Sequence, residues 1–336
     1  MKIPLHDIFG DNFIIQLATE AEDAEITPDH VQIDDDKLMK LLKMIADISE
    51  EKEKQKQETI KRTKNKEQKE GGGKNIIIPF AGNDSRTVWK DVLSCYSYSE
   101  NIQLSEMLRN FEMKECKKVA VMSFMRPEWY EFNKAMRKVE IKVEEYYVLL
   151  AMAGWVLTNI SNTGNIFINI FSPQGGILFS LNKDIGGKTL GARPETAFSL
   201  WITKKILDIL SSNTIVNYIK VYILTRGSNT INLANEFSVD TARLLSKPHL
   251  LTNTLERIAY RALQDKNELR GYYIHLVNYI YQYITNPKKI DELLYFANRD
   301  TLIIEKSNDE VAKELEEVSN YINTVLYREA LTGGLL

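Results

Sequence analysis

The sequence has 336 residues, a mass of 38.7 kDa and a formal net charge of −3. Apolar residues make up 44% and charged residues 26%, which is the composition of a globular protein with its own core rather than of a disordered chain. The longest apolar stretch, 146–157, is too short to cross a bilayer, so a membrane-spanning protein is not expected. At roughly 100–200 residues per domain, the length predicts about two domains.

The charge is distributed unevenly along the chain. Residues 1–150 contain 24 basic and 28 acidic side chains, residues 151–290 contain 15 and 8, and residues 291–336 contain 4 and 10. A basic middle with acidic ends favours a nucleic-acid-binding core carrying additions that contact something else. Because acidic segments repel a phosphate backbone, we expect these additions to contact proteins.

Cysteine and histidine are scarce. The two cysteines, Cys95 and Cys116, have no CxxC spacing and cannot form a disulfide framework, so the simple expectation is a protein in reducing conditions. Four histidines are scattered along the chain. The sequence therefore predicts neither a metal site nor a cofactor.

The first half of the chain is predicted to be mainly helical. Leucine and isoleucine at helical spacing predict a helix that begins at Asp36, but after Ser49 the pattern becomes almost purely charged up to about residue 69. That charged part is either an arm along a partner or a solvated spacer, and three glycines at 71–73 follow it as a linker. We thus expect an acidic, charged extension at 1–74 and a mainly helical one at 75–152. Within the second, the expected elements are a strand at 76–80 and helices at 100–117 and 127–151.

From Trp155 onward the pattern becomes one of strands alternating with helices. The order of these elements is typical of an α/β layer with a mixed sheet. Expected strands are 155–161, 166–171, 176–181, 219–224 and 272–280, and expected helices are 195–210, 255–264 and 308–330. A tight hairpin turn is expected at 162–164, because Asn162 and Gly164 can adopt the positive φ that such a turn needs.

A glycine-rich basic loop at 183–193 is the main candidate site. Its Gly186-Gly187-Lys188-Thr189 segment looks like the end of a phosphate-binding P-loop, but Asn182 stands where that motif needs a glycine. Glycines still let the backbone approach a phosphate chain, and Lys183, Lys188 and Arg193 supply cations. We expect this loop to contact the RNA backbone.

No catalytic constellation stands out. The expected strands between Trp155 and Leu181 contain no carboxylate that could hold the two divalent ions of a metal-dependent nuclease. The sequence therefore predicts a binding protein rather than an enzyme, with no catalytic residues.

Several short motifs occur in the order found in one known family. They are Asn165 to Phe171, Gln174-Gly175, Gly191-Ala192-Arg193-Pro194-Glu195-Thr196-Ala197-Phe198-Ser199, Thr225-Arg226-Gly227-Ser228, Arg261-Ala262-Leu263-Gln264 and Pro287-Lys288-Lys289. This pattern resembles the universal small-subunit ribosomal protein eleven family. Glu195 departs from the family's small polar residue, and most of its basic tail is missing.

The resemblance implies a ribonuclease-H-like mixed-sheet core without catalysis at 153–289. This core would carry an insertion at about 229–254 and an acidic helical extension at 290–336. It further implies a structural role on the platform of the small ribosomal subunit, near the messenger exit. The implied partners are small-subunit rRNA, neighbouring ribosomal proteins and nearby messenger RNA, with no membrane. Because the family pattern is eroded and extended, the chain is most similar to a mitochondrial member, with a plastid one as the lesser alternative.

Chemistry and resemblance together define the RNA-binding candidates. They are Lys183, Gly187, Lys188, Gly191, Arg193, Arg226, Ser228, Arg261, Lys288 and Lys289. Two other interpretations stay open: a ribonuclease-H-like enzyme acting on nucleic acid, and a viral nucleocapsid-type RNA-binding protein.

Overall fold

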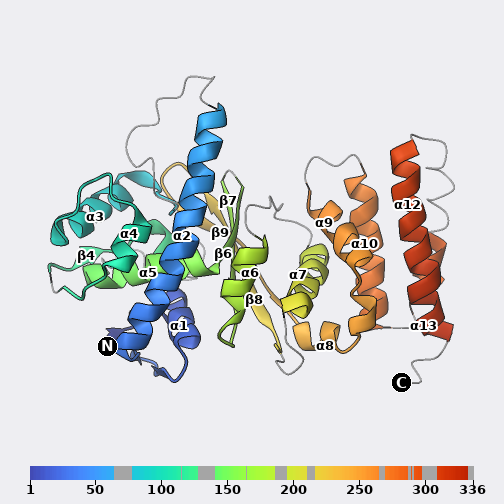
Figure 1. Ribbon diagram of the computed structural model, residues 1–336, viewed down its shortest axis with the longest axis horizontal. Coiled ribbons are helices and arrows are strands. Elements are labelled where there is room, and N and C mark those ends of the chain that lie inside the picture. The colour runs from blue at the N-terminus through green and yellow to red at the C-terminus, as the bar shows by residue number, and fades with distance from the viewer. Residues whose placement is uncertain are drawn as a thin grey trace. The chain divides into compact units, whose positions relative to one another are not determined.

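The computed structural model shows an α/β protein that is mainly helical (Figure 1). It describes residues 1–63, 78–114, 116–127, 141–163, 165–185, 195–209, 216–264, 269–286, 289, 291–296 and 309–331. The chain forms two compact units, one of residues 1–188 with 220–237 and the other of residues 189–219 with 238–336. The four-part division expected from the sequence stays a prediction.

The first unit begins with a small antiparallel sheet and two helices. The strands β1 (Lys2–Pro4), β3 (His30–Gln32) and β2 (Glu25–Ile26) pair in that order, and α1 (Gly10–Ala21) lies between β1 and β2 in the chain. The helix α2 (Asp35–Thr63) confirms the predicted N-terminal helix, whose expected last residues lie outside the described part. Its apolar stripe is buried, as the spacing predicted.

The next segment holds short elements. They are α3 (Gly82–Cys95), α4 (Leu104–Arg109), β4 (Val119–Ala120), a 3-10 turn η1 (Ser123–Met125) and β5 (Lys142–Val143). The helix expected at 100–117 is therefore reduced to α4, and residues 78–80 of the expected strand are not extended in a sheet. Most of the helix expected at 127–151 falls on 128–140, outside the described residues.

A wholly buried helix, α5 (Glu145–Thr158), forms the centre of the first unit. It runs through Trp155–Thr158, where a strand was predicted, so that part of the prediction is wrong. The Trp155 ring lies 5.8 Å from Phe13 on α1 and 5.4 Å from Phe167 on the sheet. The α2 side chain of Lys52 donates to the main-chain oxygens of Val156 (2.8 Å) and Asn159 (2.6 Å), which ties α2 to the end of α5.

A four-stranded sheet packs against α5. Its strands are β6 (Asn159–Thr163), β7 (Ile166–Phe171), β8 (Ile219–Arg226) and β9 (Ile231–Val239), in that order across the sheet. The pairs β6/β7 and β7/β8 are antiparallel, with Ile166 opposite Thr225 and Phe171 opposite Lys220. The expected β6–β7 hairpin and the expected strand at 219–224 are confirmed, but Asn162 and Thr163, which were expected in the turn, are paired residues of β6. Residues 177–185 form the helix α6 (Ile177–Ile185) instead of the predicted strand.

The second unit is helical. Its elements are α7 (Glu195–Ile209), α8 (Thr241–Leu245), η3 (Pro248–Leu250), α9 (Asn253–Leu263), α10 (Arg270–Thr285), a helix at 291–296, α12 (Asp309–Tyr321), the π-helix η5 (Ile322–Leu326) and α13 (Tyr327–Leu331). The helices predicted at 195–210, 255–264 and 308–330 are confirmed. The strand predicted at 272–280 is wrong, because these residues lie in α10. The expected insertion, 229–254, contains β9, α8 and η3, and its origin as an insertion stays a prediction.

The C-terminal helices bury their apolar stripe within the second unit. Leu315, Val318 and Ile322 are almost fully buried, and the Tyr321 hydroxyl donates to the main-chain oxygen of Leu250 at 2.6 Å. This stripe therefore has its own core. Among the described helices, none has both the length and the apolar character that crossing a membrane requires.

Candidate nucleic-acid interface

The turn between β8 and β9 presents a cation and several uncharged polar groups to solvent. We call residues 226–230 the hairpin tip. The Gly227 N–H donates to the Thr230 main-chain oxygen at 2.8 Å, which closes the turn between β8 and β9. The Arg226 N–H donates to the Asn165 oxygen at 2.7 Å, so the tip is also tied to the neighbouring β6–β7 hairpin. The backbone of the tip is thus held from two sides.

The side chains of the hairpin tip suit contact with a nucleic-acid backbone. Arg226, Ser228 and Asn229 are exposed, and the guanidinium of Arg226 lies 5.8 Å from the buried Phe167 ring. No acidic residue occurs from 225 to 235. Guanidinium, hydroxyl and amide groups are the side chains that most often contact phosphate oxygens.

The start of α3 packs closely against the tip. Gly82 has a φ of +69°, and a Cβ on it would lie 2.9 Å from the Asn229 main-chain oxygen. A side chain at position 82 would therefore both strain the backbone and push the tip away.

Of the glycine-rich loop at 183–193, the structure describes residues 183–185, which form the end of α6. Lys183 lies in the last turn of α6 and is exposed beside the exposed Asp184. Gly187, Lys188, Gly191 and Arg193 lie outside the described residues. The RNA contact expected for this loop stays a prediction.

The candidates of the second unit lie on separate elements. Arg261 is on the exposed face of α9, and Lys289 forms an ion pair with Glu292 at 2.5 Å. Lys288 lies outside the described residues. Other cations of this unit are paired too, as Arg257 is with Glu317 at 2.7 Å. Of the five candidates that the structure describes, Arg226 and Ser228 are the two that lie together on one structural element.

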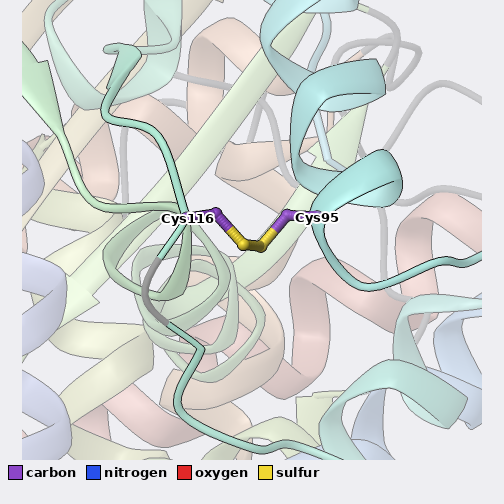
Figure 2. Close-up of a disulfide and its surroundings, with 2 residues drawn as sticks. All are labelled: Cys95 and Cys116. Atoms are coloured by element: carbon purple, nitrogen blue, oxygen red, sulfur yellow. A yellow bond between two sulfur atoms is a disulfide. The ribbon is translucent and has the colours of Figure 1, made fainter.

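A second cluster contains both cysteines. Cys95, the last residue of α3, is bonded to Cys116 in the loop before β4 (Figure 2), with their Cα atoms 6.1 Å apart. The sequence did not anticipate this single bond, and the expectation of reducing conditions stays a prediction. The carboxylate of Glu145, the first residue of α5, lies with the two sulfur atoms inside a group whose ligand atoms are all within 4.8 Å of one another. No sequence motif signals this cluster, because the cysteines are 21 residues apart.

The Glu145 carboxyl group is in an unfavourable place for a charge. Its burial raises the pKa of Glu145, and the neighbouring carboxylates of Asp91 and Glu144 raise it further. By contrast, Lys118 pairs with Glu144 at 2.9 Å and contributes to lowering the pKa of Glu144. The pKa values of these two adjacent glutamates at the start of α5 are therefore shifted in opposite directions.

Comparison with known families decides the identity of the chain. The family described as CRISPR-associated protein, CsaX, matches residues 31–301, which is 271 of the 336 residues. The chain belongs to this family. The CsaX match includes the hairpin tip, both cysteines and Glu145. Neither a curated protein nor a solved structure matches the chain.

Membership of the CsaX family overturns the ribosomal interpretation. A structural role in the small ribosomal subunit, with rRNA, messenger RNA and ribosomal proteins as partners, is wrong, and so is a mitochondrial or plastid location, because CRISPR systems are prokaryotic. The two alternatives, a ribonuclease-H-like enzyme and a viral nucleocapsid protein, have no support either. The motif alignment failed for a structural reason, since it placed strands at 176–181 and 272–280, where α6 and α10 lie.

Proposed function

We propose that this chain is a non-catalytic subunit of a CRISPR ribonucleoprotein and that it contacts the guide RNA. The observation that carries the proposal is the CsaX match, which extends over parts of both compact units. In RNA-guided complexes, base pairing reads the sequence, while protein subunits hold the RNA through its backbone. The excess of basic residues at 151–290 agrees with such a role.

The hairpin tip is the part of the described surface that best fits this contact. Arg226 can bind a phosphate through two parallel N–H donors, and Ser228 and Asn229 can add hydrogen bonds beside it. Since the turn is fixed by Gly227 and by the contact with Asn165, these groups need little ordering when they bind. The loop that begins after Lys183 would extend the contact with its own cations.

A role in binding without catalysis is carried over from the sequence as part of this proposal. Within the described residues, the one group with metal-ligating spacing contains two cysteines and a single carboxylate. A two-metal nuclease site needs several oxygen ligands that hold two ions. A ribonuclease-H-like arrangement of the core remains a prediction, and the proposal does not depend on it.

Isolation of the native complex tests this function. The full chain, tagged at one end, is expressed together with the other proteins and the repeat–spacer array of its own CRISPR locus, and the RNA that purifies with it is sequenced. We expect repeat-derived guide RNA and other CRISPR-associated proteins in stoichiometric amounts. A chain that purifies alone, or with RNA that reflects only cellular abundance, would refute the proposal.

A further inference from the structure

Three side chains from separate segments of the first unit converge on one point. Cys95 ends α3, Cys116 follows α4 in the chain, and Glu145 begins α5. One ligand atom from each lies within 4.8 Å of the other two. Cys116 is exposed, so ions and reductants in solution can reach the group.

Glu145 is buried without a partner for one of its oxygens. The residue is only 3% exposed, and its Oε2 atom has no hydrogen-bond donor among the described residues. A buried carboxylate normally needs such a donor, an opposite charge or a metal ion. The nearby Lys118 pairs with Glu144 instead, so the oxygen of Glu145 lacks the compensation that its neighbour has.

We propose that Cys95, Cys116 and Glu145 bind one zinc ion when the two cysteines are reduced. Thiolate and carboxylate are established zinc ligands, with bond lengths of about 2.3 Å to sulfur and about 2.0–2.2 Å to oxygen. Two sulfur atoms and an oxygen that are already grouped within 4.8 Å need only small side-chain adjustments to reach this geometry. Water occupies the fourth tetrahedral position on the exposed Cys116 side.

The disulfide and the zinc site are alternative states of the same cysteine pair. A dithiol reductant supplies two electrons and two protons, the Cys95–Cys116 bond breaks to give two thiols, and the reductant closes to its own disulfide. Zinc then displaces the two thiol protons, which pass to solvent, and the ionised Glu145 carboxylate completes the protein ligands. The disulfide links α3 to the loop before β4, and the zinc site would join the start of α5 to them.

Metal analysis of the full-length protein tests this site. The protein is reduced with dithiothreitol, freed of reductant without oxygen, incubated with zinc and desalted. We expect about one zinc ion per chain in the reduced protein and none in the oxidised protein. Cobalt in place of zinc should show the charge-transfer absorption of a thiolate complex. Zinc bound equally by reduced and oxidised protein, or by neither, would overturn the proposal.

Variants separate the ligands from general effects of folding. Cys116→Ser should abolish stoichiometric zinc binding, and Glu145→Gln, which keeps the size of the side chain, should weaken it by at least about tenfold, the lower end of the range seen for changes around a metal site. Glu53→Gln is the matched control, because Glu53 is another buried glutamate and its carboxylate accepts from the Ser105 hydroxyl at 2.8 Å. An unchanged affinity in Glu145→Gln would show that Glu145 is not a ligand. Because metal content is the readout, the result is independent of RNA binding.

Discussion

A Cβ atom on Gly154 would lie 2.5 Å from the main-chain oxygen of Phe13, so α5 and α1 approach each other too closely at this point to admit a side chain there. The same Cβ would lie 2.6 Å from the Cβ of Phe13. Neither neighbour is the end of a flexible side chain. The absence of a side chain at position 154 is therefore a condition for the packing of the first unit.

Replacing Gly154 by alanine should destabilise the protein. The two helices must separate to admit the methyl group, and overpacking of this kind costs about 1–3 kcal/mol, which exceeds the gain in helix propensity. Urea unfolding measures the loss. Gly271→Ala on α10 is the control, because nothing lies within 4 Å of its added Cβ and the change should be neutral or slightly stabilising. Equal effects at both positions would contradict this account of the packing.

The elements that sequence predicted correctly are those with a clear apolar period. The buried residues of α2 and of α12 recur at helical spacing, and β7 and β8 are short apolar runs between turn residues. In α10 the sequence is rich in tyrosine and isoleucine, which favours a strand, yet the buried residues have helical spacing: Tyr273, Leu276, Val277, Ile280, Tyr283 and Ile284. In α10 the spacing of the apolar residues, rather than the residue types, therefore indicates the correct secondary structure. In α5 all residues are buried, so no period separates helix from strand around Trp155.

Sequence alone pointed to one of the two candidate sites and not to the other. The β8–β9 turn follows from Gly227 and Ser228, which are typical turn residues. The ribosomal role inferred from it was wrong, since short basic and glycine-containing motifs recur in unrelated folds, while its contact with RNA stays a prediction. The convergence of Cys95, Cys116 and Glu145 depends on the packing of α3 against α5, and no local pattern encodes that packing.

The ion pair between Lys205 and Glu256 should contribute strongly to the second unit. It joins α7 to α9 at 2.8 Å, and the side chains are only 9% and 19% exposed. Changing Glu256 to glutamine removes the negative charge that faces this buried ammonium, which should cost about 2–4 kcal/mol. Thermal or urea unfolding measures this loss. The exposed pair of Lys289 and Glu292 provides the control, where Glu292→Gln should change stability by less than about 1 kcal/mol. Similar losses for both variants would show that burial does not set the strength of the pair.

Glu20 should make stability depend on pH. Burial raises the pKa of Glu20 from 4.5 to about 7, although its carboxylate accepts from the Gly176 N–H at 2.6 Å. Between pH 4.5 and about 7 the folded protein keeps this proton and the unfolded chain releases it. The contribution of Glu20 to the free energy of unfolding therefore decreases as pH rises through that window.

The variant Glu20→Gln cannot titrate and should lose this part of the pH dependence. Urea unfolding at several pH values within the window should show the stability of Glu20→Gln rising relative to the wild type as the pH increases. Glu25→Gln, on the exposed strand β2, should keep the wild-type slope. Parallel curves for wild type and Glu20→Gln would contradict the assignment.

Arg226 should bind RNA phosphate at the hairpin tip. Removing one phosphate contact reduces the slope of log affinity against log salt by about 0.7–0.9, so Arg226→Ala should weaken binding and flatten its salt dependence by that amount. The measurement is binding of repeat-derived guide RNA to the full-length protein across a salt series. Arg109→Ala is the matched control, because Arg109 pairs with Asp47 at 2.7 Å and Glu50 at 2.5 Å and lies among acids that repel RNA. Since Arg226 is exposed, its variant should unfold at the wild-type temperature. A variant that folds normally and keeps the wild-type affinity and slope would exclude the hairpin tip from the RNA contact.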